Sequence, residues 1–464
     1  MIDPSRLLER VAQQLETALV RHPPASDRPY SLTLPLPELR LGGLVQVPSP
    51  WFYWSRPARE EYRLGVGQAI NFSCHGERRF QALENFFHQT AARWDRIDPQ
   101  DTQLSPVLFT GFAFSAEEII DSGWRPLPNA GLFLPELLLQ QKGNRCTITC
   151  SLSAAASRQT ATVSSRWLGL IEQLFRGMAQ RPGPPGHKTM LTRIHDTPAR
   201  EPWLAAVQQA LRAIEANALE KVVLSRSIRV RAQRRLNPVQ LMSTLDCLYP
   251  NNLHFAIAQA GLTFVAASPE RLLRCEDRRI FSDALAGTAP RSADEAEDRQ
   301  IGLALQHDPK AGHEHRLVVD SIRQSLGNVC QQVGPVMEPR LLRLRGLQHL
   351  RTEVSGLLKP GASLFSAAAQ LHPSAAVNGT LRQPAQAWLQ AHEDQPRGWY
   401  TGAAGWIDPA GNGDLAVLIR CALLEGDEAE LFAGAGITRG SDPATEYRET
   451  ELKFTAMLEA LENA

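Results

Sequence analysis

The chain has 464 residues, 43% of them hydrophobic, and its 49 Lys and Arg residues balance 49 Asp and Glu residues. This composition is ordinary for a globular protein and allows about two or three domains, or one large domain with an appendage. The balanced charge argues against broad binding to nucleic acid or to an anionic membrane, because both require an excess of basic residues. No apolar run approaches the roughly 20 residues that cross a bilayer. We therefore expect no nucleic-acid partner and no membrane partner.

Residues 1–20 predict an amphipathic helix after Asp3 and Pro4. They lack the apolar core and cleavage site of a signal peptide, so we expect a cytoplasmic protein. Seven cysteines are scattered along the chain, and Cys146 and Cys150 share the strand-like run RCTITC. A single pair of this kind is weak evidence for a zinc site. The spacing favours reduced, mostly buried thiols.

The break between two parts of the chain is predicted at residues 181–188, RPGPPGHK, where three prolines and two glycines cannot continue a helix or a strand. Before it, residues 49–57 and 104–115 predict strands, and residues 77–94 predict a helix. No catalytic spacing of His, Asp, Glu or Lys occurs in residues 1–180. We therefore assign residues 1–190 to an N-terminal structural part that completes the fold, and residues 191–464 to the part that carries the chemistry.

The second part is denser in turn signals. Residues 201–220 predict a helix and residues 221–230 a strand, and residues 301–329 predict two helices broken near Pro309. Two further segments predict hairpins: residues 262–287 with a turn at 276–278, and residues 397–436 as three strands with turns at 409–412 and 425–428. Hairpins outnumber crossovers, which favours antiparallel sheets flanked by helices, an α+β fold.

The glycine-rich segment LFAGAGITRGSDPATEYRET, residues 431–450, raises the possibility of a phosphate-binding loop. Gly434, Gly436 and Gly440 follow a strand and precede a helix. The strand belongs to a hairpin, however, and the helix begins with Asp442 as N-cap and carries glutamates that would repel a pyrophosphate. This context argues against dinucleotide binding.

The helix after the loop places Glu446, Glu449 and Lys453 on one face, since they are spaced i, i+3 and i+7. A solvated face with a Glu449–Lys453 ion pair explains this spacing on its own. The functional alternative is a hard-cation site beside a clamp for a substrate carboxylate, because Mg²⁺ takes one or two protein carboxylates together with water and substrate oxygens.

Three other residues are candidates outside this helix. Glu314 lies between His313 and His315, and two histidines two residues apart on a helix point in nearly opposite directions, so they cannot share one zinc ion. Lys221 opens a strand on its core-facing side. Glu270 follows a proline at the start of an apolar segment. Taken singly, each is better explained by structure than by function.

Together these stretches resemble the chorismate-utilising enzymes, the family of isochorismate, salicylate, anthranilate and aminodeoxychorismate synthases. The resemblance covers roughly residues 200–460 and is much looser before residue 180. The matching stretches are 220–227 (EKVVLSRS), 266–274 (AASPERLLR), 284–291 (ALAGTAPR), 313–319 (HEHRLVV), 348–352 (QHLRT), 371–379 (LHPSAAVNG), 397–406 (RGWYTGAAGW), 411–424 (GNGDLAVLIRCALL) and 433–453 (AGAGITRGSDPATEYRETELK).

The resemblance implies two stacked antiparallel sheets flanked by helices, with the active site in the cleft between them and one Mg²⁺ ion. It implies metal ligation by Glu314 and Glu449, and by Glu446 directly or through water. The substrate residues that it implies are Arg420, Lys453, Tyr400 and the backbone of Gly436 for carboxylates, Gly287 and Thr288 near C4 of the ring, and His349 beside the ring.

Within the family, Ala376 stands where salicylate synthases carry threonine, and alanine is similar to what isochorismate synthases carry. Lys221 agrees, because family members that use water as nucleophile carry lysine there as the base. Residues 342–354 and 437–447 look like the menaquinone-type isochorismate synthases. Two positions depart from the pattern: Ala311 stands where many relatives have an acidic residue, and Asn378 replaces a smaller residue.

The resemblance therefore implies an isomerase whose small-molecule substrate is chorismate, and we expect it to act as a monomer. Lys221 would take a proton from water, which attacks C2, and Glu270, kept protonated, would protonate the leaving C4 hydroxyl. The alternatives are a salicylate synthase of the same family and a binding protein with this fold but without catalysis. Downstream routes to menaquinone and to siderophores or salicylate both begin at isochorismate.

Overall fold

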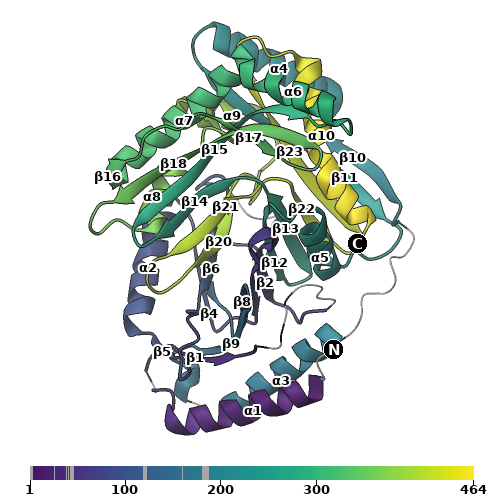
Figure 1. The fold of residues 1–464 in the computed structure, drawn as a ribbon. Coiled ribbons are helices and arrows are strands. Elements are labelled where there is room, and N and C mark those ends of the chain that lie inside the picture. Colours follow the sequence, from purple (N-terminus) through teal and green to yellow (C-terminus); the bar gives the residue numbers. More distant parts are fainter. Residues whose placement is uncertain are drawn as a thin grey trace.

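The computed structural model describes residues 4–25, 27–37, 39, 41, 46–118, 123–158, 160–179 and 188–464. Two large β-sheets stack on each other and helices cover their outer faces, so the expected α+β class with two stacked sheets is confirmed (Figure 1). Every strand pairing between described residues is antiparallel except that of β1 with β5.

The first sheet has 13 strands among the described residues. Its central path is β10-β11-β23-β22-β13-β12-β2-β3-β8-β9-β1-β5, with β19 beside β11. Its strands are β1 (Tyr30–Pro35), β2 (Trp51–Arg56), β3 (Glu61–Val66), β5 (Asp95–Ile97), β8 (Leu137–Lys142), β9 (Arg145–Leu152), β10 (Leu191–Thr197), β11 (Lys221–Ala232), β12 (Leu253–Gln259), β13 (Leu262–Ser268), β19 (Gly379–Thr380), β22 (Cys421–Glu425) and β23 (Glu428–Thr438).

In the part of the chain that the structure describes, the second sheet has 10 strands in the order β16-β18-β15-β14-β21-β20-β6-β7-β4, with β17 beside β18. Its strands are β4 (Ile70–Cys74), β6 (Leu108–Phe112), β7 (Ala130–Leu134), β14 (Arg271–Glu276), β15 (Arg279–Pro290), β16 (Cys330–Val333), β17 (Arg340–Arg343), β18 (Leu347–Leu358), β20 (Ala403–Ile407) and β21 (Gly413–Val417).

The helices lie on the outer faces of the two sheets (Figure 1). They are α1 (Pro4–Arg21), α2 (Arg79–Arg93), α3 (Thr160–Ala179), α4 (Arg200–Glu215), α5 (Pro238–Leu248), α6 (Glu295–His307), α7 (Pro309–Val329), α8 (Leu364–Leu371), α9 (Arg382–His392) and α10 (Pro443–Glu462). The structure confirms the helices expected near residues 1–20, 77–94 and 201–220. It also confirms the pair of helices broken at Pro309, since this proline fixes the first turn of α7 and Asp308 is the N-cap.

The core is layered in the same way as the backbone. Aromatic side chains fill the space between the sheets, where the Phe52 ring of β2 stacks on that of Phe109 of β6 at 5.3 Å between centroids. A second apolar layer lies between the first sheet and helices α1, α3, α5 and α10, and a third lies between the second sheet and helices α2, α7 and α8. Burial of this apolar surface is the main stabilising contribution to the stacked arrangement.

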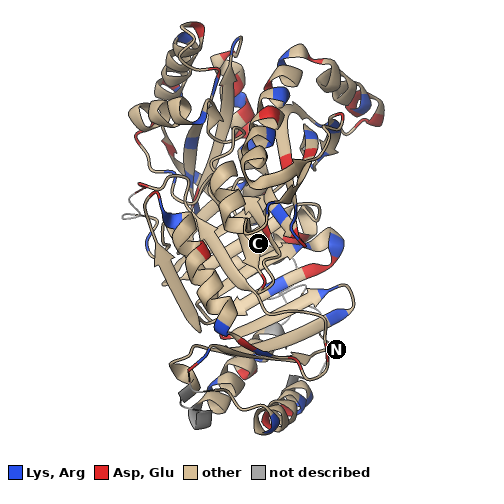
Figure 2. Ribbon diagram, turned by 90° about the vertical axis from the view of Figure 1, so that its left-hand side faces the viewer, with Lys and Arg blue, Asp and Glu red and all other residues tan. Residues whose placement is uncertain are grey.

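Strands from both parts of the chain share the two sheets: β2 pairs with β12 in the first sheet, and β6 pairs with β20 in the second. The proposed break at residues 181–188 falls almost wholly outside the described residues, so the division at residue 190 stays a prediction. Basic and acidic residues are interspersed along the outer elements in the view of Figure 2. Among the described helices, none is both long enough and apolar enough to cross a lipid bilayer.

Two predictions about the strands are wrong. The expected hairpin at residues 262–287 is three strands, because residues 262–276 divide into β13 and β14, which belong to different sheets. Residues 397–436 form four strands instead of three, because the apolar run from Gly413 to Glu425 divides into β21 and β22, which belong to different sheets. The chain crosses between the sheets at residues 418–420, where Arg420 adopts a left-handed φ of 51°. Apolar periodicity cannot distinguish one long strand from two that continue into separate sheets.

Candidate active site

A pocket opens between the two sheets, where β11 and β23 of the first face β15 and β18 of the second, and α7 and α10 close its side. It encloses about 680 Å³ of space, including solvent at its mouth. All the predicted site residues except Glu446 line it: Lys221, Glu270, Gly287, Thr288, Glu314, His349, Ala376, Tyr400, Arg420, Gly436, Glu449 and Lys453. The site residues predicted from the sequence therefore gather in the expected cleft between the sheets.

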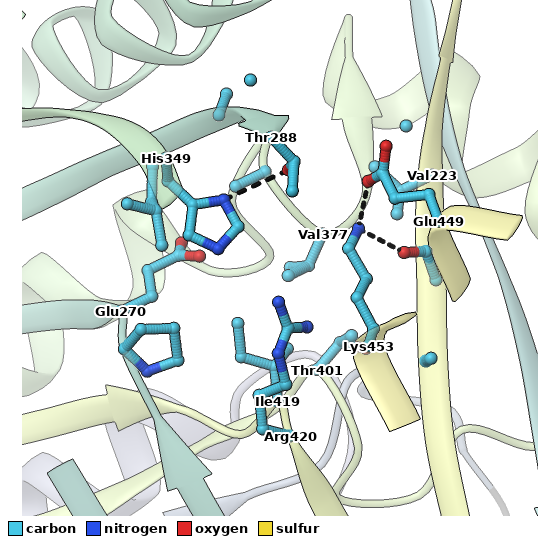
Figure 3. Close-up of a pocket in the computed structure, with 18 of the residues that line it drawn as sticks. Val223, Glu270, Thr288, His349, Val377, Thr401, Ile419, Arg420, Glu449 and Lys453 are labelled. Atoms are coloured by element: carbon cyan, nitrogen blue, oxygen red, sulfur yellow. Dashed lines mark hydrogen bonds and ion pairs between the residues drawn. The ribbon is translucent and has the colours of Figure 1, made fainter. Parts of the chain in front are cut away.

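Two of these residues lie where the chain passes from one sheet to the other. Glu270 lies between β13 of the first sheet and β14 of the second, and Arg420 lies between β21 and β22. The two crossovers are neighbours, since Ala267 N–H donates to the Arg420 carbonyl at 3.0 Å and Val417 N–H donates to the Glu270 carbonyl at 3.1 Å. Both side chains consequently point into the pocket (Figure 3).

Glu270 is 4% exposed, and its surroundings disfavour a negative charge. Burial, with a smaller contribution from Asp283, raises the pKa of Glu270 to about 8, against the opposing charges of Lys221 and Arg420. The carboxyl group therefore holds a proton at neutral pH, which a general acid requires.

Arg420 is the main cation of the pocket without a fixed partner. Among the described residues, its guanidinium forms no ion pair within 4.0 Å, and it points into the open pocket (Figure 3). Burial lowers its pKa, although the charges of Glu449 and Glu270 favour its protonated form. A planar guanidinium with free donors is suited to bind a carboxylate in a bidentate manner.

Lys221 and Glu314 form an ion pair at the base of the pocket. The distance from Lys221 Nζ to Glu314 Oε1 is 2.9 Å, and the lysine side chain is 1% exposed. Although burial opposes ionisation of Glu314, Lys221 lowers its pKa. Lys221 thus faces the core as expected, and Glu314 of α7 neutralises its charge.

Gly436 makes room for this ion pair. A Cβ atom on Gly436 would lie 2.8 Å from Glu314 Oε1, closer than real Cβ contacts, and 3.0 Å from Lys221 Cε, tighter than most of them. A side chain on neighbouring Gly434 would lie 2.8 Å from the Tyr400 hydroxyl. Because these two positions carry no side chain, β23 can lie close to the groups of the pocket. A phosphate-binding loop is therefore not needed to explain the glycines.

Gly436→Ala is expected to displace the Lys221–Glu314 pair and to lower kcat/KM by about 100-fold or more, because small misplacements of reacting groups have effects of this size. Steady-state kinetics measures the change. The matched control is Gly169→Ala on α3, where an added methyl group meets no atom within 4 Å. Full activity in Gly436→Ala would contradict the role given to this glycine.

A β-bulge shapes the wall beside the second sheet. The register between β15 and β18 shifts between Ala286 and Thr288, and Gly287 at the bulge has φ of 77°. The bulge turns Thr288 toward His349, whose Nδ1 lies 3.1 Å from the threonine Oγ1 (Figure 3). Burial, with help from Arg420 and Lys453, lowers the pKa of His349 to about 3, so the ring is neutral.

The Nε2 atom of the neutral His349 ring is buried and has no hydrogen-bond partner among the described residues. Such an atom is available for a substrate, since buried polar groups are normally paired. Tyr400 is also buried, its ring stacked 5.4 Å from that of Phe432, and burial raises the pKa of its hydroxyl. Ala376 adds a methyl group to the lining and no polar atom.

Helix α10 supplies Glu449 and Lys453. The Lys453 ammonium lies 2.6 Å from Glu449 Oε1 and donates to the Gly434 carbonyl at 2.7 Å (Figure 3). The helix begins as expected, with the Asp442 side chain accepting from Thr445 N–H at 2.8 Å. The Glu449–Lys453 ion pair expected for a solvated helix face is therefore present, but it lies in the pocket and not on a solvated face.

The opposite side of α10 is held by Arg226 of β11, whose side chain is fully buried. Its guanidinium donates to Thr450 Oγ1 at 3.0 Å, to Glu451 Oε1 at 2.7 Å and to the Tyr447 hydroxyl at 3.0 Å. It also lies 4.2 Å from the centroid of the Tyr447 ring. Arg226 therefore fixes the helix whose other face carries Glu449 and Lys453.

Arg226→Gln is expected to lower the free energy of unfolding by about 2–3 kcal/mol, because it leaves several buried partners of the guanidinium unsatisfied. Urea denaturation followed by circular dichroism measures this. Arg231→Gln on the same strand is the control, since Arg231 forms an exposed pair with Glu428 and should change stability little. A loss no larger than that of the control would show that α10 does not depend on Arg226.

The three carboxylates assigned to a metal are each paired with a lysine. Glu446 lies outside the pocket lining and binds Lys310 at 3.0 Å, as Glu314 binds Lys221 and Glu449 binds Lys453. No group of three acidic, histidine or cysteine side chains among the described residues is gathered closely enough to hold a metal ion as it stands.

The donor set nevertheless fits a hard cation. Burial, followed by the charge of Glu449, raises the pKa of Glu446, so these two carboxylates lie in each other's field. A divalent cation would relieve that repulsion, and carboxylate oxygens are the ligands that Mg²⁺ prefers. His315 is occupied elsewhere, with Nε2 2.8 Å from Thr352 Oγ1, while His313 is exposed.

Residues that the sequence did not single out complete the pocket and its support. Val223, Ile419 and Phe432 form apolar parts of the wall. Val223 could have been found, because it lies two residues after Lys221 on the same face of a strand. Lys310 and Arg226 carried no local signal, since their partners lie on other elements, α10 for Lys310 and both α10 and β10 for Arg226.

Known proteins match the chain over nearly its full length. The family model described as chorismate binding enzyme matches residues 32–462. Isochorismate synthase MenF of Bacillus subtilis (strain 168) is 32% identical over 419 residues, 88% of this chain and 87% of the relative. The salicylate biosynthesis isochorismate synthase of Pseudomonas aeruginosa is 32% identical over 445 residues, 94% of this chain and 91% of the relative.

A solved structure agrees with the sequence matches. That of MenF, the menaquinone-specific isochorismate synthase from Escherichia coli, superposes with a TM-score of 0.82 at 28% identity and covers 98% of this chain and 99% of the other. The pocket between the sheets, with nearly all of the expected residues around it, is thus set in a shared fold. The chain belongs to the chorismate binding enzyme family.

Proposed function

We propose that the protein is an isochorismate synthase, an isomerase that converts chorismate to isochorismate. The observation that carries the proposal is one pocket containing both a buried lysine, Lys221, and a buried carboxyl group, Glu270, whose pKa is raised to about 8. The names of its relatives and the position of Ala376 in the lining support it.

The substrate would be held by the cations of the pocket. Arg420 has free donors for one carboxylate of chorismate. Lys453, which donates to the Gly434 carbonyl of β23, adds a second positive charge to the pocket. His349 and Thr288 lie beside the ring, and the Nε2 of His349 gains a partner. Burial of these groups strengthens each interaction, because the pocket excludes most water.

The reaction then requires one proton acceptor and one proton donor. Lys221 is the proposed acceptor of the proton from the water that attacks C2, and the double bonds shift as the C4 hydroxyl leaves. Glu270 donates its proton to that hydroxyl, which departs as water. The proton gained by Lys221 must return to Glu270 through solvent before the next turnover, so the isomerisation consumes no net proton.

We propose Mg²⁺ as the cofactor, held by Glu314 and Glu449 and, directly or through water, by Glu446. When bound, the ion supplies positive charge that neutralises the ring carboxylate and orients the substrate. A bound ion would compete with the lysines now paired with these carboxylates. We further propose a monomer that acts in the cytoplasm, on a route to menaquinone or to siderophores and salicylate.

Incubation of the purified protein with chorismate and Mg²⁺, followed by chromatographic separation, tests the proposal. Isochorismate is the expected product. Release of pyruvate with fluorescent salicylate would replace the proposal by the salicylate synthase alternative. Absence of turnover at every Mg²⁺ concentration would favour a binding protein with this fold.

A further inference from the structure

Lys310 forms an ion pair that the reaction outlined above does not use. It lies in the first turn of α7, two residues after the N-cap Asp308. Its Nζ is 3.0 Å from Oε1 of Glu446, whose side chain is only 4% exposed, while the lysine side chain is 44% exposed. The ammonium group is thus held at the edge of the site by a buried carboxylate.

The charge of Lys310 lies in the field of all three carboxylates assigned to the metal. Although burial opposes its protonated form, Glu446 raises the pKa of Lys310, and Glu314 and Glu449 add to this effect. The Lys310 ammonium therefore already supplies a positive charge beside Glu446, within the field of the other two carboxylates.

The other two carboxylates are neutralised by lysines that the reaction needs. Lys221 binds Glu314 and Lys453 binds Glu449, and both lysines line the pocket. Lys310 does not line it. Its partly exposed stem can swing the ammonium into water, so it is the lysine that can leave without removing a catalytic or substrate-binding group.

The neighbouring residue offers no second anchor for Lys310. Position 311 is alanine, buried against the Gly287 bulge, and carries no carboxylate that could keep the ammonium in place or join the metal. Glu446 is therefore shared between two cations, the lysine and any incoming metal ion. Occupation by one must weaken occupation by the other.

We propose that Lys310 takes the place of the divalent cation in the metal-free protein and is displaced into solvent when the ion binds. The inference rests on the Mg²⁺ site proposed above. Lys310 then sets the metal affinity. In the metal-free protein its charge offsets the repulsion between the carboxylates, and Mg²⁺ binding is weakened by the free energy needed to displace it.

Calorimetric titration of the full-length protein with MgCl₂ alone, without chorismate, tests the proposal. Lys310→Gln is expected to bind Mg²⁺ about tenfold more tightly than the wild type, which corresponds to about 1.4 kcal/mol. Lys310→Arg, which keeps the charge, and Lys359→Gln, an exposed lysine at the end of β18, should bind like the wild type. In EDTA, Lys310→Gln should melt a few degrees below the wild type, and saturating Mg²⁺ should remove that difference.

The outcomes separate the two proposals. If the wild type binds Mg²⁺ and Lys310→Gln binds it equally or more weakly, the Lys310 inference is overturned while the metal site stands. If neither protein binds Mg²⁺ and Glu449→Gln behaves the same, both the metal site and the inference are overturned. Unchanged Mg²⁺ affinity with a raised KM for chorismate would instead make Lys310 a substrate contact.

Discussion

Replacing Lys221 by alanine is expected to lower kcat by about 10³-fold or more while leaving the fold intact. The buried amine is the proposed base of the pocket, and general bases contribute about 10²–10⁴-fold to a rate. Chorismate turnover measured with saturating Mg²⁺ gives the comparison.

The Lys221 experiment needs a control for the charge left behind. Glu314 loses its partner at 2.9 Å, which alone can lower stability. Circular dichroism and thermal unfolding of the variant separate loss of fold from loss of chemistry, and Lys359→Ala controls for removal of a lysine at an exposed position. Turnover close to that of the wild type in Lys221→Ala would refute the assigned base.

Replacing Glu270 by glutamine is expected to lower kcat by about 10²–10⁴-fold and to remove one limb of the pH profile. Since the acid acts while protonated, kcat/KM of the wild type should fall as pH rises through the pKa of about 8. The glutamine variant keeps shape and burial but holds no titrating proton, so its residual rate should not fall there. A wild-type profile flat from pH 6 to 9 would count against Glu270 as the acid.

The same substitution should change stability in a predictable direction. The pKa of Glu270 is raised in the folded state from an ordinary value of 4.5, so the native protein binds this proton more tightly than the unfolded chain. That contribution is complete below pH 4.5 and is lost as pH rises toward about 8, by at most about 1.4 kcal/mol per pH unit. Glu270→Gln should therefore unfold less readily than the wild type near pH 8, as urea denaturation at several pH values would measure.

Sequence alone determined those features that depend on neighbouring residues. The start of α10 at Asp442 and Pro443, the break at Pro309 and the turn at residues 276–278 were all predicted correctly, because capping groups, proline and turn residues act within a few positions. The resemblance to a family added the roles of 12 of the 22 residues that line the pocket. It did so through short motifs and not through any pattern of periodicity.

Only the tertiary structure decided how those residues are paired. The run from Gly413 to Glu425 divides between two sheets, and this crossover carries Arg420 into the cleft. Two of the candidate metal ligands meet lysines from distant elements: Lys310 of α7 meets Glu446 of α10, and Lys221 of β11 meets Glu314 of α7. Such pairs depend on sheet register and helix packing, which bring together charges that are far apart along the chain, so no local pattern of the sequence could have predicted them.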